Sequence, residues 1–335
     1  MRRPTLEDVA RAAGVSRALV SLVIRGAPGA SQETRARVLG IANQLGYQAD
    51  VRARLLAQAS PRLIGVTYIV GSLHHAELLS PIYATAEGAG YEIIISGRAR
   101  RHEEPDAIDT LLSYRCDALL LLSPDLSDDE LEGIAAALPV LSLGRRIRHQ
   151  PTAVDVVRTD ERAGVQMAID HLYGLGHRRI AHIDGGAGTI STDRRRAYRN
   201  HMTQLGLRDQ VRIATGSHSA EAGRRAGTRL LTEPGDLPTG LVCYNDECAW
   251  GAMRALAEAG LRVPEDVSVV GYDGSAVARM APRELTTVRQ DTATLGRQGV
   301  ERLIARIETG LQADDVRITP SLMPGETTGT VRQTP

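Results

Sequence analysis

Arginine is the only residue type with a permanently cationic side chain in this 335-residue chain. Lys and Arg together number 40, and every one of these residues is Arg. A P-loop needs a lysine at the phosphates of its nucleotide, a protein kinase needs one on its third strand, and pyridoxal-phosphate enzymes need an amine nucleophile. The absence of lysine therefore excludes these enzyme classes.

The other reactive side chains lack the spacing of a catalytic or metal site. Cys116, Cys243 and Cys248 are too few for a disulfide framework, and no histidine stands near them at metal-finger spacing. The pair His74-His75 has no carboxylate partner at motif spacing. We therefore expect reduced cysteines that serve packing, no metal, no cofactor and no catalytic centre.

Two further features have ordinary structural interpretations. Residues 185–188, Gly-Gly-Ala-Gly, follow a predicted strand, but they lack the spacing of a dinucleotide-binding fingerprint. A loop at the edge of a cleft is the better interpretation of this segment. Trp250 is the single tryptophan, and its place on a predicted helix assigns it to the core.

Charge is distributed unevenly along the chain. Residues 1–62 hold ten Arg against four acidic residues, a net charge of +6, whereas the whole chain is neutral. A basic segment of this kind indicates a polyanionic partner such as nucleic acid. The N-terminus lacks the apolar centre of a signal peptide, and no apolar run approaches the ~20 residues that span a bilayer. We therefore expect a cytoplasmic protein that is neither exported nor embedded in a membrane.

The N-terminal residues predict two short helices joined by a tight turn. Thr5 and Asp8 have the spacing of a capping box at the start of a helix over 6–13. Residues 14–16, Gly-Val-Ser, make a turn whose serine can cap a second helix over 17–24. Two helices with such a turn are typical of a helix-turn-helix, whose second helix enters the major groove. On spacing alone, a generic small helical bundle fits equally well.

A third helix and a helix-compatible linker follow. Ser31 can cap a helix that ends at Gly46. Residues 50–57 also suit a helix, but a segment this short is not stable by itself. The apolar face of the third helix is predicted to consist of Val38, Ile41, Ala42 and Leu45.

From residue 63 onward, short apolar runs alternate with helical stretches. This alternation indicates two α/β lobes, each a parallel sheet covered by helices. A cleft at the carboxyl ends of the strands in two such lobes is a natural ligand site. The predicted strands are 63–70, 91–96, 118–122, 140–143, 180–184, 211–214, 240–244 and 267–271, and the predicted helices include 81–89 and 105–114.

Longer motifs run through both parts of the chain: Thr5-Leu6-Glu7-Asp8-Val9-Ala10, Ala13-Gly14-Val15-Ser16, Val20-Ser21, Ser31, Thr34-Arg35, Leu45-Gly46-Tyr47, Leu175-Gly176-His177-Arg178-Arg179-Ile180, Asn245-Asp246, 260–273 and Leu285-Thr286-Thr287-Val288. Together they resemble the LacI/GalR family of bacterial transcription repressors over nearly the whole chain. The resemblance implies a small all-α helix-turn-helix DNA-binding domain, followed by an α/β two-lobe domain of the periplasmic-binding-protein type I fold with parallel sheets.

The resemblance also implies where the domains begin and end. The DNA-binding domain covers residues 1–48, a hinge helix and linker cover 49–62, and the effector-binding and dimerisation domain covers 63–331. The chain of this family crosses between the lobes three times, so the predicted helix at about 292–308 should return to the first lobe. The first lobe then comprises about 63–158 and 290–319, and the second about 159–289 and 320–331.

The family's DNA-contacting positions fall on the first helices of this chain. Those that face base edges match Arg17, Ala18 and Leu22. Arg17 can reach O6 and N7 of a guanine with two hydrogen bonds, and Ala18 is small enough to accept a thymine methyl. Leu22 stands where many relatives have a polar residue, so it can read a base only by apolar contact. The rest of the DNA-binding set, mostly near phosphates, is Thr5, Leu6, Ser16, Ser21 and Arg25, and Arg25 replaces a usual Asn.

Residues 50–57 match the family's hinge helix. The resemblance implies that this helix folds on DNA, with Leu56 wedged into a central minor-groove step and Ala53 packed beside its dimer mate. An apolar wedge of this kind unstacks a base step and bends the duplex. The alternative is a plain linker helix, with Leu55 and Leu56 buried on the body of the protein.

The family's effector contacts fall on Arg194, Asn245 and Asp273, with Ser191, His218 and Gln290 as further candidates. A planar guanidinium and a carboxylate can each engage two neighbouring hydroxyls of a sugar or the polar edge of a base. This chain departs from the family pattern at three places. Its predicted loop 71–76 is short and lacks an aromatic pair, His218 stands where a stacking aromatic is common, and Gly274 replaces a frequent second Asp. A hexose effector is therefore not implied.

These features together predict a homodimeric, ligand-responsive repressor in the bacterial cytoplasm, at the nucleoid when bound to DNA. The DNA-binding domains of the two chains would bind the half-sites of a pseudo-palindromic double-stranded operator. A small-molecule effector in the cleft would control the affinity for this operator. Either induction or corepression fits the sequence. No heptad repeat follows the last predicted strand, so a dimer is the expected state.

Three rival interpretations compete with this prediction. A sugar-binding transport receptor would share the two-lobe body but would need a signal peptide and no basic head. An α/β enzyme would need a nucleophile, a base or a metal cluster in the cleft, and none has recognisable spacing. A repressor could instead respond to a phosphoprotein corepressor on the flank of the first lobe.

Overall fold

The computed structural model of the chain describes residues 4–24, 26–47, 61–148, 153–279, 283–310 and 315–331. The chain divides into two compact units, residues 1–61 and residues 62–335. Three of the predicted DNA-contacting positions, Arg25, Ala53 and Leu56, lie outside the described residues. No described helix is both long enough and apolar enough to span a bilayer.

The first unit contains the predicted helix-turn-helix. Helices α1 (Leu6–Ala13) and α2 (Arg17–Ile24) have the predicted bounds, and α3 (Gln32–Gln44) follows them. The capping box at α1 is present, because Thr5 Oγ1 accepts from the Asp8 amide at 3.3 Å and Asp8 Oδ2 accepts from the Thr5 amide at 2.9 Å. Gly14 ends α1 with a φ of 65°, a left-handed conformation that favours glycine.

The three helices of the head pack around a small apolar core. Arg35 on α3 holds the preceding loop, because its Nη2 donates to the carbonyl of Ala27 at 2.7 Å. The predicted apolar face of α3 is right in part: Val38 and Ala42 are buried and Ile41 is half-buried, whereas Leu45 is 39% exposed. Leu45 differs because α3 ends at Gln44 and Leu45 is its C-cap. The core residues are Val9, Ala10, Ala13, Val20, Val23, Val38 and Ala42.

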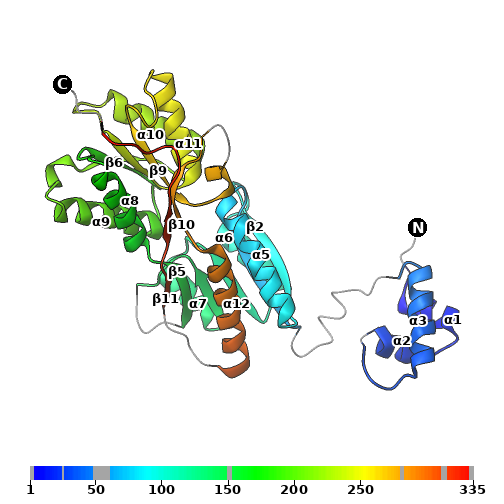
Figure 1. The fold of residues 1–335 in the computed structure, drawn as a ribbon. Coiled ribbons are helices and arrows are strands. Elements are labelled where there is room, and N and C mark those ends of the chain that lie inside the picture. The colour runs from blue at the N-terminus through cyan, green and yellow to red at the C-terminus, as the bar shows by residue number, and fades with distance from the viewer. Residues whose placement is uncertain are drawn as a thin grey trace. The chain divides into compact units, whose positions relative to one another are not determined.

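The first lobe of the second unit is a six-stranded parallel sheet, in the order β11-β5-β4-β3-β1-β2 (Figure 1). Helices α5 and α12 lie side by side over one face, where their apolar residues join those of the strands in one core. The strands are β1 (Leu63–Ile69), β2 (Glu92–Arg98), β3 (Ala118–Leu122), β4 (Val140–Leu143), β5 (Val154–Thr159) and β11 (Val316–Ile318), and the helices are α5 (Leu73–Gly88), α6 (Glu104–Ser113), α7 (Asp128–Ala135) and α12 (Thr292–Thr309).

The second lobe is a six-stranded sheet in the order β12-β10-β9-β8-β6-β7, with β12 antiparallel to β10. Helices α8 and α9 share a core with one face of this sheet, and α10 and α11 share a core with the other. The strands are β6 (Ile180–Asp184), β7 (Arg212–Thr215), β8 (Gly240–Cys243), β9 (Ser268–Asp273), β10 (Thr286–Arg289) and β12 (Ser321–Met323), and the helices are α8 (Glu161–Gly174), α9 (Thr189–Gln204), α10 (Ala220–Thr232) and α11 (Asp246–Glu258).

The chain passes between the lobes after β5, after β10 and after β11. Helix α12 packs into the core of the first lobe through Leu295, Val300 and Leu303, so the predicted return of this helix is confirmed. These three crossings bring the carboxyl ends of β5, β9 and β10 together between the lobes, where a ligand site is expected in a fold of this kind.

The sequence prediction was wrong at several elements. Helix α5 begins at Leu73, so residues 73–76 are its first turn rather than a loop, and Pro81 lies inside the helix instead of at its start. The apolar pattern did not predict strands β5, β10, β11 and β12. Strand β5 carries Asp155 and Arg158, which are buried in ion pairs with Arg306 and Asp315, and such charges hide the apolar pattern of a strand.

Two predictions about packing residues had different outcomes. Cys243 and Cys248 are buried free cysteines in the core of the second lobe, as expected. Trp250 is only half-buried, and its indole Nε1 donates to the carbonyl of Val277 at 3.0 Å. The assignment of Trp250 to the core was therefore wrong, because the indole bridges α11 to the loop after β9.

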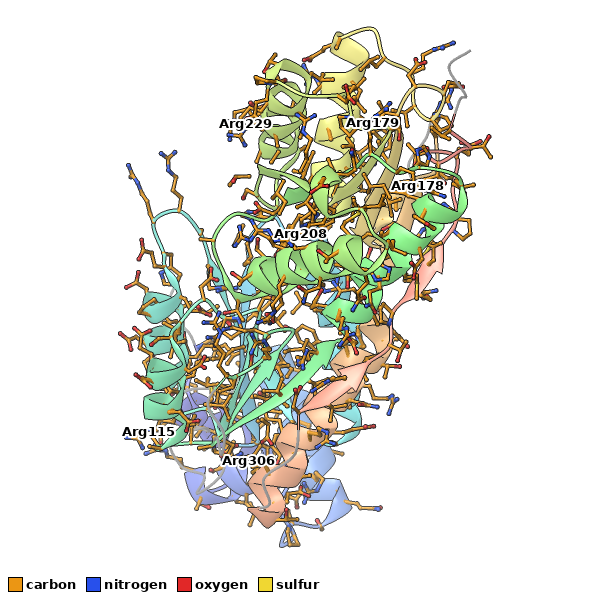
Figure 2. The ribbon with its side chains drawn as sticks, turned by 90° about the vertical axis from the view of Figure 1, so that its left-hand side faces the viewer. Arg115, Arg178, Arg179, Arg208, Arg229 and Arg306 are labelled. Carbon is orange, nitrogen blue, oxygen red and sulfur yellow. The ribbon has the colours of Figure 1, made fainter. Side chains whose placement is uncertain are left out.

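Arginine side chains cover both lobes, and many of them hold backbone segments in place. Figure 2 shows Arg115 and Arg306 on the first lobe and Arg178, Arg179, Arg208 and Arg229 on the second. The Arg178 guanidinium stacks on the Tyr173 ring at 3.8 Å and donates to the Tyr173 carbonyl at 2.9 Å. Arg179 Nε donates to the carbonyl of Leu237 at 3.0 Å. Arg178 and Arg179 therefore have structural roles that do not indicate a ligand.

Candidate functional site

Helix α2 of the first unit presents the predicted base-reading residues on its exposed side. Arg17 and Ala18 are exposed, whereas Val20 and Val23 on the opposite side are buried in the core. Among the described residues, none forms an ion pair with Arg17, so its guanidinium is available to a guanine edge. Leu22 is half-buried, and its Cδ1 would lie 3.2 Å from a Cβ added at Gly29, so part of this side chain packs on the following loop.

The predicted phosphate-contacting residues lie near the starts of α1 and α2. Thr5 and Ser16 are exposed, and both side chains cap their helices through backbone amides. Leu6 and Ser21 are half-buried on α1 and α2. Helix N-termini favour anions because their free N–H groups and their dipole both point toward them. This arrangement suits a phosphate backbone along one side of the unit.

A cavity of about 140 Å³ lies between the two lobes of the second unit. Its wall comes from the carboxyl ends of β1, β3, β6, β8 and β9 and from the loops that follow them. The glycine-rich loop 185–188 contributes to the wall, which supports its interpretation as a cleft loop. The structure brings all six predicted effector residues to this cavity: Ser191, Arg194, His218, Asn245, Asp273 and Gln290.

Arg194 is held firmly in the cavity wall. Its Nε donates to Glu161 Oε2 at 2.6 Å, and its Nη1 donates to the carbonyl of Tyr244 at 2.5 Å. The guanidinium carbon lies 3.5 Å from the centre of the Tyr272 ring, a cation–π contact. Gly164 makes room for this tyrosine, since a Cβ there would meet Tyr272 Oη at 2.2 Å. Contacts from α8, from the residue after β8 and from β9 therefore hold the buried guanidinium in one conformation.

Asp273 ends β9 in a left-handed conformation with a φ of 105°. Its Oδ1 accepts from Gln290 Nε2 at 2.7 Å, and Gln290 Oε1 accepts from Thr159 Oγ1 at 2.5 Å. This chain of hydrogen bonds joins the ends of β9, β10 and β5 across two of the lobe crossings. Burial raises the pKa of the Asp273 carboxyl well above its ordinary value, against the opposing effect of Arg194.

The other predicted effector residues differ in how far hydrogen bonds within the protein use their polar atoms. Asn245 caps α11, because its Oδ1 accepts from the Cys248 amide at 2.9 Å, and its Nδ2 donates to the His218 carbonyl at 2.9 Å. Ser191 Oγ accepts from the Gly185 amide at 3.1 Å. The His218 side chain is exposed at the edge of the cavity. Asn245 and Ser191 therefore shape the wall more than they present free polar atoms.

Several further side chains line the cavity that the sequence did not predict. Glu161 and Tyr244 directly follow β5 and β8, so their place after a strand was a usable signal. His74 is half-buried in the wall, and its buried Nδ1 has no hydrogen-bond partner among the described residues. Burial, with Arg194 nearby, lowers the pKa of His74 to about 3, so this imidazole is neutral at physiological pH. The described residues contain no group of three or more side chains that could hold a metal ion.

Polar contacts between the lobes flank the cavity. On one side, Arg146 from the first lobe forms two hydrogen bonds to Asp193 on α9, at 2.6 and 2.9 Å. Its neighbour Arg145 donates from Nε to Thr189 Oγ1 at 3.1 Å. On another side, Glu77 on α5 accepts from the backbone amide of Ala276 at 2.8 Å. These contacts set the distance between the two walls of the cavity.

Comparison with known proteins identifies the family. Residues 5–50 match the lacI family of bacterial regulatory proteins, and residues 169–328 match the periplasmic binding protein-like domain. The transcriptional regulator AscG of Escherichia coli is 33% identical over 315 residues, which cover 91% of this chain and 93% of AscG. The chain belongs to the LacI family of bacterial regulatory proteins. The lactose operon repressor of Escherichia coli is also similar, with 32% identity over 91% of this chain and 85% of the repressor.

Solved structures of LacI-family proteins share the fold of this chain. The lac repressor dimer bound to operator and the anti-inducer ONPF has a TM-score of 0.84 and 29% identity, and covers 98% of this chain and 100% of that one. The regulator CelR in complex with cellobiose has a TM-score of 0.70 and 30% identity, and covers 97% of this chain and 100% of CelR. These findings confirm the predicted family and fold class.

Membership of the LacI family excludes two of the rival interpretations, the transport receptor and the α/β enzyme, and leaves the phosphoprotein corepressor open. This protein is a DNA-binding transcriptional regulator with a ligand-binding domain, and its relatives are named as transcriptional regulators and repressors rather than enzymes. The head that matches residues 5–50 is a DNA-binding domain of this family, which the transport-receptor interpretation lacked.

Proposed function

We propose that this LacI-family regulator is a homodimeric repressor whose affinity for a pseudo-palindromic operator is controlled by a small polar molecule in the interlobe cavity. The observation that carries the proposal is the meeting of Arg194, Asp273 and Gln290 at one cavity between two lobes. A ligand that contacts both walls would favour one separation of the lobes, and a regulator can respond only to a ligand that distinguishes its states.

The cavity suits a compact ligand with several hydroxyl or amide groups. Its volume of about 140 Å³ is small beside the ~300–1,000 Å³ of pockets for drug-sized ligands, so a molecule of monosaccharide size or below fits best. The carboxyl of Asp273 and the guanidinium of Arg194 can hold neighbouring hydroxyls. The relative CelR supports the hydroxyl-rich chemistry but not the size, because it has been solved with cellobiose, a disaccharide.

A second copy of this chain fits the open edge of the first sheet. Strand β2 ends the order of that sheet, so its outer hydrogen-bonding groups have no neighbouring strand among the described residues. Large apolar side chains are exposed on this strand and on elements beside it: Val70 is 53% exposed, Tyr83 41%, Ile95 39% and Leu112 38%. Exposed apolar groups of this kind favour a protein interface. The similar lac repressor structure is a dimer, which supports the same state here.

In the DNA complex, Arg17, Ala18 and Leu22 on α2 would read base edges in the major groove. Thr5, Leu6, Ser16, Ser21 and Arg25 would fix the head on the backbone, mostly through phosphates. Ala53 and Leu56 would act in the hinge helix, with Leu56 as a minor-groove wedge. The functional division is a DNA-binding domain at 1–48, a hinge and linker at 49–62, and an effector and dimerisation domain at 63–331.

Selection of bound fragments from a random duplex library by the full-length protein tests the DNA part of this proposal. We expect enrichment of a palindromic motif whose half-sites are about one helical turn apart. The enriched duplex then serves as the probe for a screen of monosaccharides, sugar acids and nucleobases that shift affinity. No enriched motif, with or without cell metabolites, would contradict operator binding. Enrichment of a single asymmetric half-site would contradict the dimer.

A further inference from the structure

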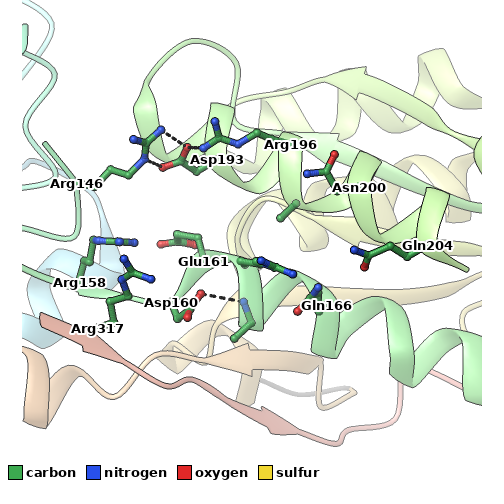
Figure 3. Close-up of a pocket in the computed structure, with 13 residues that line it drawn as sticks. Arg146, Arg158, Asp160, Glu161, Gln166, Asp193, Arg196, Asn200, Gln204 and Arg317 are labelled. Atoms are coloured by element: carbon green, nitrogen blue, oxygen red, sulfur yellow. Dashed lines mark hydrogen bonds and ion pairs between the residues drawn. The ribbon is translucent and has the colours of Figure 1, made fainter. Parts of the chain in front are cut away.

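A second, larger space lies beside the lobe crossings and is distinct from the effector cavity. It is an open groove of about 620 Å³, and Glu161 is the single residue that its described lining shares with the effector cavity. Figure 3 shows Arg146, Arg158 and Arg317 at one end of this groove, with Gln166, Asn200 and Gln204 toward the other. We call it the arginine groove, after its five arginines: Arg146, Arg158, Arg162, Arg196 and Arg317.

The five arginines come from both lobes. Arg146 follows β4, Arg158 lies on β5 and Arg317 lies on β11, all in the first lobe. Arg162 is on α8 and Arg196 is on α9, in the second lobe. A ligand held at both ends of the groove would therefore bridge the lobes.

The carboxylates around the groove are too few for its guanidinium groups. Asp193 accepts from Arg146 at 2.6 and 2.9 Å and also from Arg196 at 2.6 Å, so one carboxylate serves two arginines. Asp315 is shared in the same way: it binds Arg158 at 2.7 and 2.8 Å and lies 3.6 Å from Arg317. Four guanidinium groups thus depend on two carboxylates.

The remaining charges do not restore the balance. Arg162 is exposed, and within the described part of the chain it has no acidic partner. Asp160 accepts from the Ala163 amide at the start of α8, and Glu161 is occupied by the buried Arg194. The five guanidinium groups are therefore opposed by only three carboxylates that have no other cationic partner among the described residues, those of Asp160, Asp193 and Asp315.

Some exposed arginines elsewhere on the second unit form local ion pairs, whereas others, such as Arg115 and Arg208, have no acidic partner among the described residues. Arg254 with Glu258, Arg262 with Asp266 and Arg297 with Glu301 are pairs four residues apart on the chain. Such pairs neutralise each other locally and need no ligand. The arginine groove is distinguished by five guanidinium groups from both lobes that line one hollow, rather than by the absence of a partner at a single arginine.

We infer that the arginine groove is a second binding site, for a small molecule that carries a phosphate group. The planar forks of arginine match phosphate oxygens with paired, charge-assisted hydrogen bonds, and a doubly charged phosphate requires more than one of them. The groove volume of about 620 Å³ lies within the ~300–1,000 Å³ range of small-molecule sites. The amides of Gln166, Asn200 and Gln204 supply donors and acceptors for the rest of the molecule.

This site adds a second input to the regulator. A phosphorylated ligand that contacts arginines of both lobes would stabilise the present separation of the lobes. Phosphate binding in the groove does not depend on the proposed response to a ligand in the effector cavity. Each of these two proposals can therefore be wrong while the other is right.

Calorimetric titration of the full-length protein with inorganic pyrophosphate, at a constant ionic strength of about 0.15 M, tests the site. We expect saturable binding with one pyrophosphate per chain. The triple variant Arg162→Gln, Arg196→Gln, Arg317→Gln should bind at least about tenfold more weakly, because several charge-assisted hydrogen bonds are removed. All three side chains are exposed, and Arg196 and Arg317 each share their aspartate with another arginine. None of the three lines the effector cavity.

A matched control removes the same charge elsewhere on the same unit. The triple variant Arg225→Gln, Arg254→Gln, Arg297→Gln loses three arginines that are 63%, 74% and 50% exposed, and it should keep pyrophosphate affinity within about twofold. If the triple groove variant is unstable, Arg162→Gln alone repeats the test, since Arg162 lacks an acidic partner. Absence of saturable binding by the wild type, equal binding by the groove variant, or an equal loss in the control would each overturn the site.

Discussion

Arg194 and Glu161 form a buried ion pair in the wall between the interlobe cavity and the arginine groove, with 2.6 Å from Nε to Oε2. Their side chains are 4% and 6% exposed. Burial alone would lower the pKa of Arg194, but Glu161 and the neighbouring tyrosine and aspartate groups raise it overall. The pair therefore keeps a fixed charge in a place from which water is excluded.

Replacing Glu161 by Gln should destabilise the second unit by about 3–5 kcal/mol, because the buried charge of Arg194 then lacks its carboxylate. Urea unfolding followed by the fluorescence of Trp250 measures the change. Glu301→Gln is the control, since its pair with Arg297 is half-exposed on both sides and should contribute less than about 1 kcal/mol. Equal losses in the two variants would show that the buried pair has no special role.

Replacing Gly164 by Ala should displace Tyr272 from the Arg194 guanidinium. A Cβ at this position would meet Tyr272 Oη at 2.2 Å, so α8 or the ring must move, at a cost of about 1–3 kcal/mol in the free energy of unfolding. Gly174→Ala is a matched control on the same helix, because nothing lies within 4 Å of an added Cβ there. It should be neutral or stabilising by up to about 1 kcal/mol. Identical unfolding midpoints for the two variants would contradict close packing at Gly164.

His182 should make the second unit less stable in mild acid. This histidine on β6 is buried, its Nδ1–H donates to the Val242 carbonyl at 2.8 Å, and burial lowers its pKa to about 4. The unfolded chain takes up a proton near pH 6.5, whereas the folded state does so only near pH 4. The stability present above pH 6.5 is therefore lost as the pH falls, by about 2 kcal/mol at pH 5.

The variant His182→Asn isolates this effect, because its amide can still donate to the Val242 carbonyl but does not titrate. Urea unfolding at a series of pH values from 7.5 to about 5 should give a shallower loss of stability for the variant than for the wild type. Parallel curves for the two proteins would rule out His182 as the source of the loss.

Replacing Arg17 by Ala should weaken binding to the selected operator by about 1–3 kcal/mol and relax base preference at one symmetric position. Arg37→Ala is the control: Arg37 is exposed on α3, outside the proposed base-reading set, so its loss should leave base preference unchanged. Repeating the library selection with each variant measures both effects. An Arg17→Ala protein with wild-type base preference would remove Arg17 from the base-reading set.

The sequence by itself determined the elements whose causes are local. Helices α1 and α2 have their predicted bounds because a capping box, a glycine turn and a capping serine act over three or four residues. Eight strands were predicted to within two residues at each end, since each is a short apolar run. The motifs from Thr5 to Val288 also identified the family, and with it six residues that the structure brings to one cavity.

The tertiary structure decided the features that depend on contacts between distant residues. Arg194 meets Glu161 across 33 positions, and Arg158 meets Asp315 across 157. Strand β5 carries buried charges that are stable only because those partners reach it, so its pattern by itself was misleading. The arginine groove has the same origin. Whether a charged side chain is neutralised or left in excess depends on which segments the three lobe crossings bring together, and spacing along the chain does not encode that pairing.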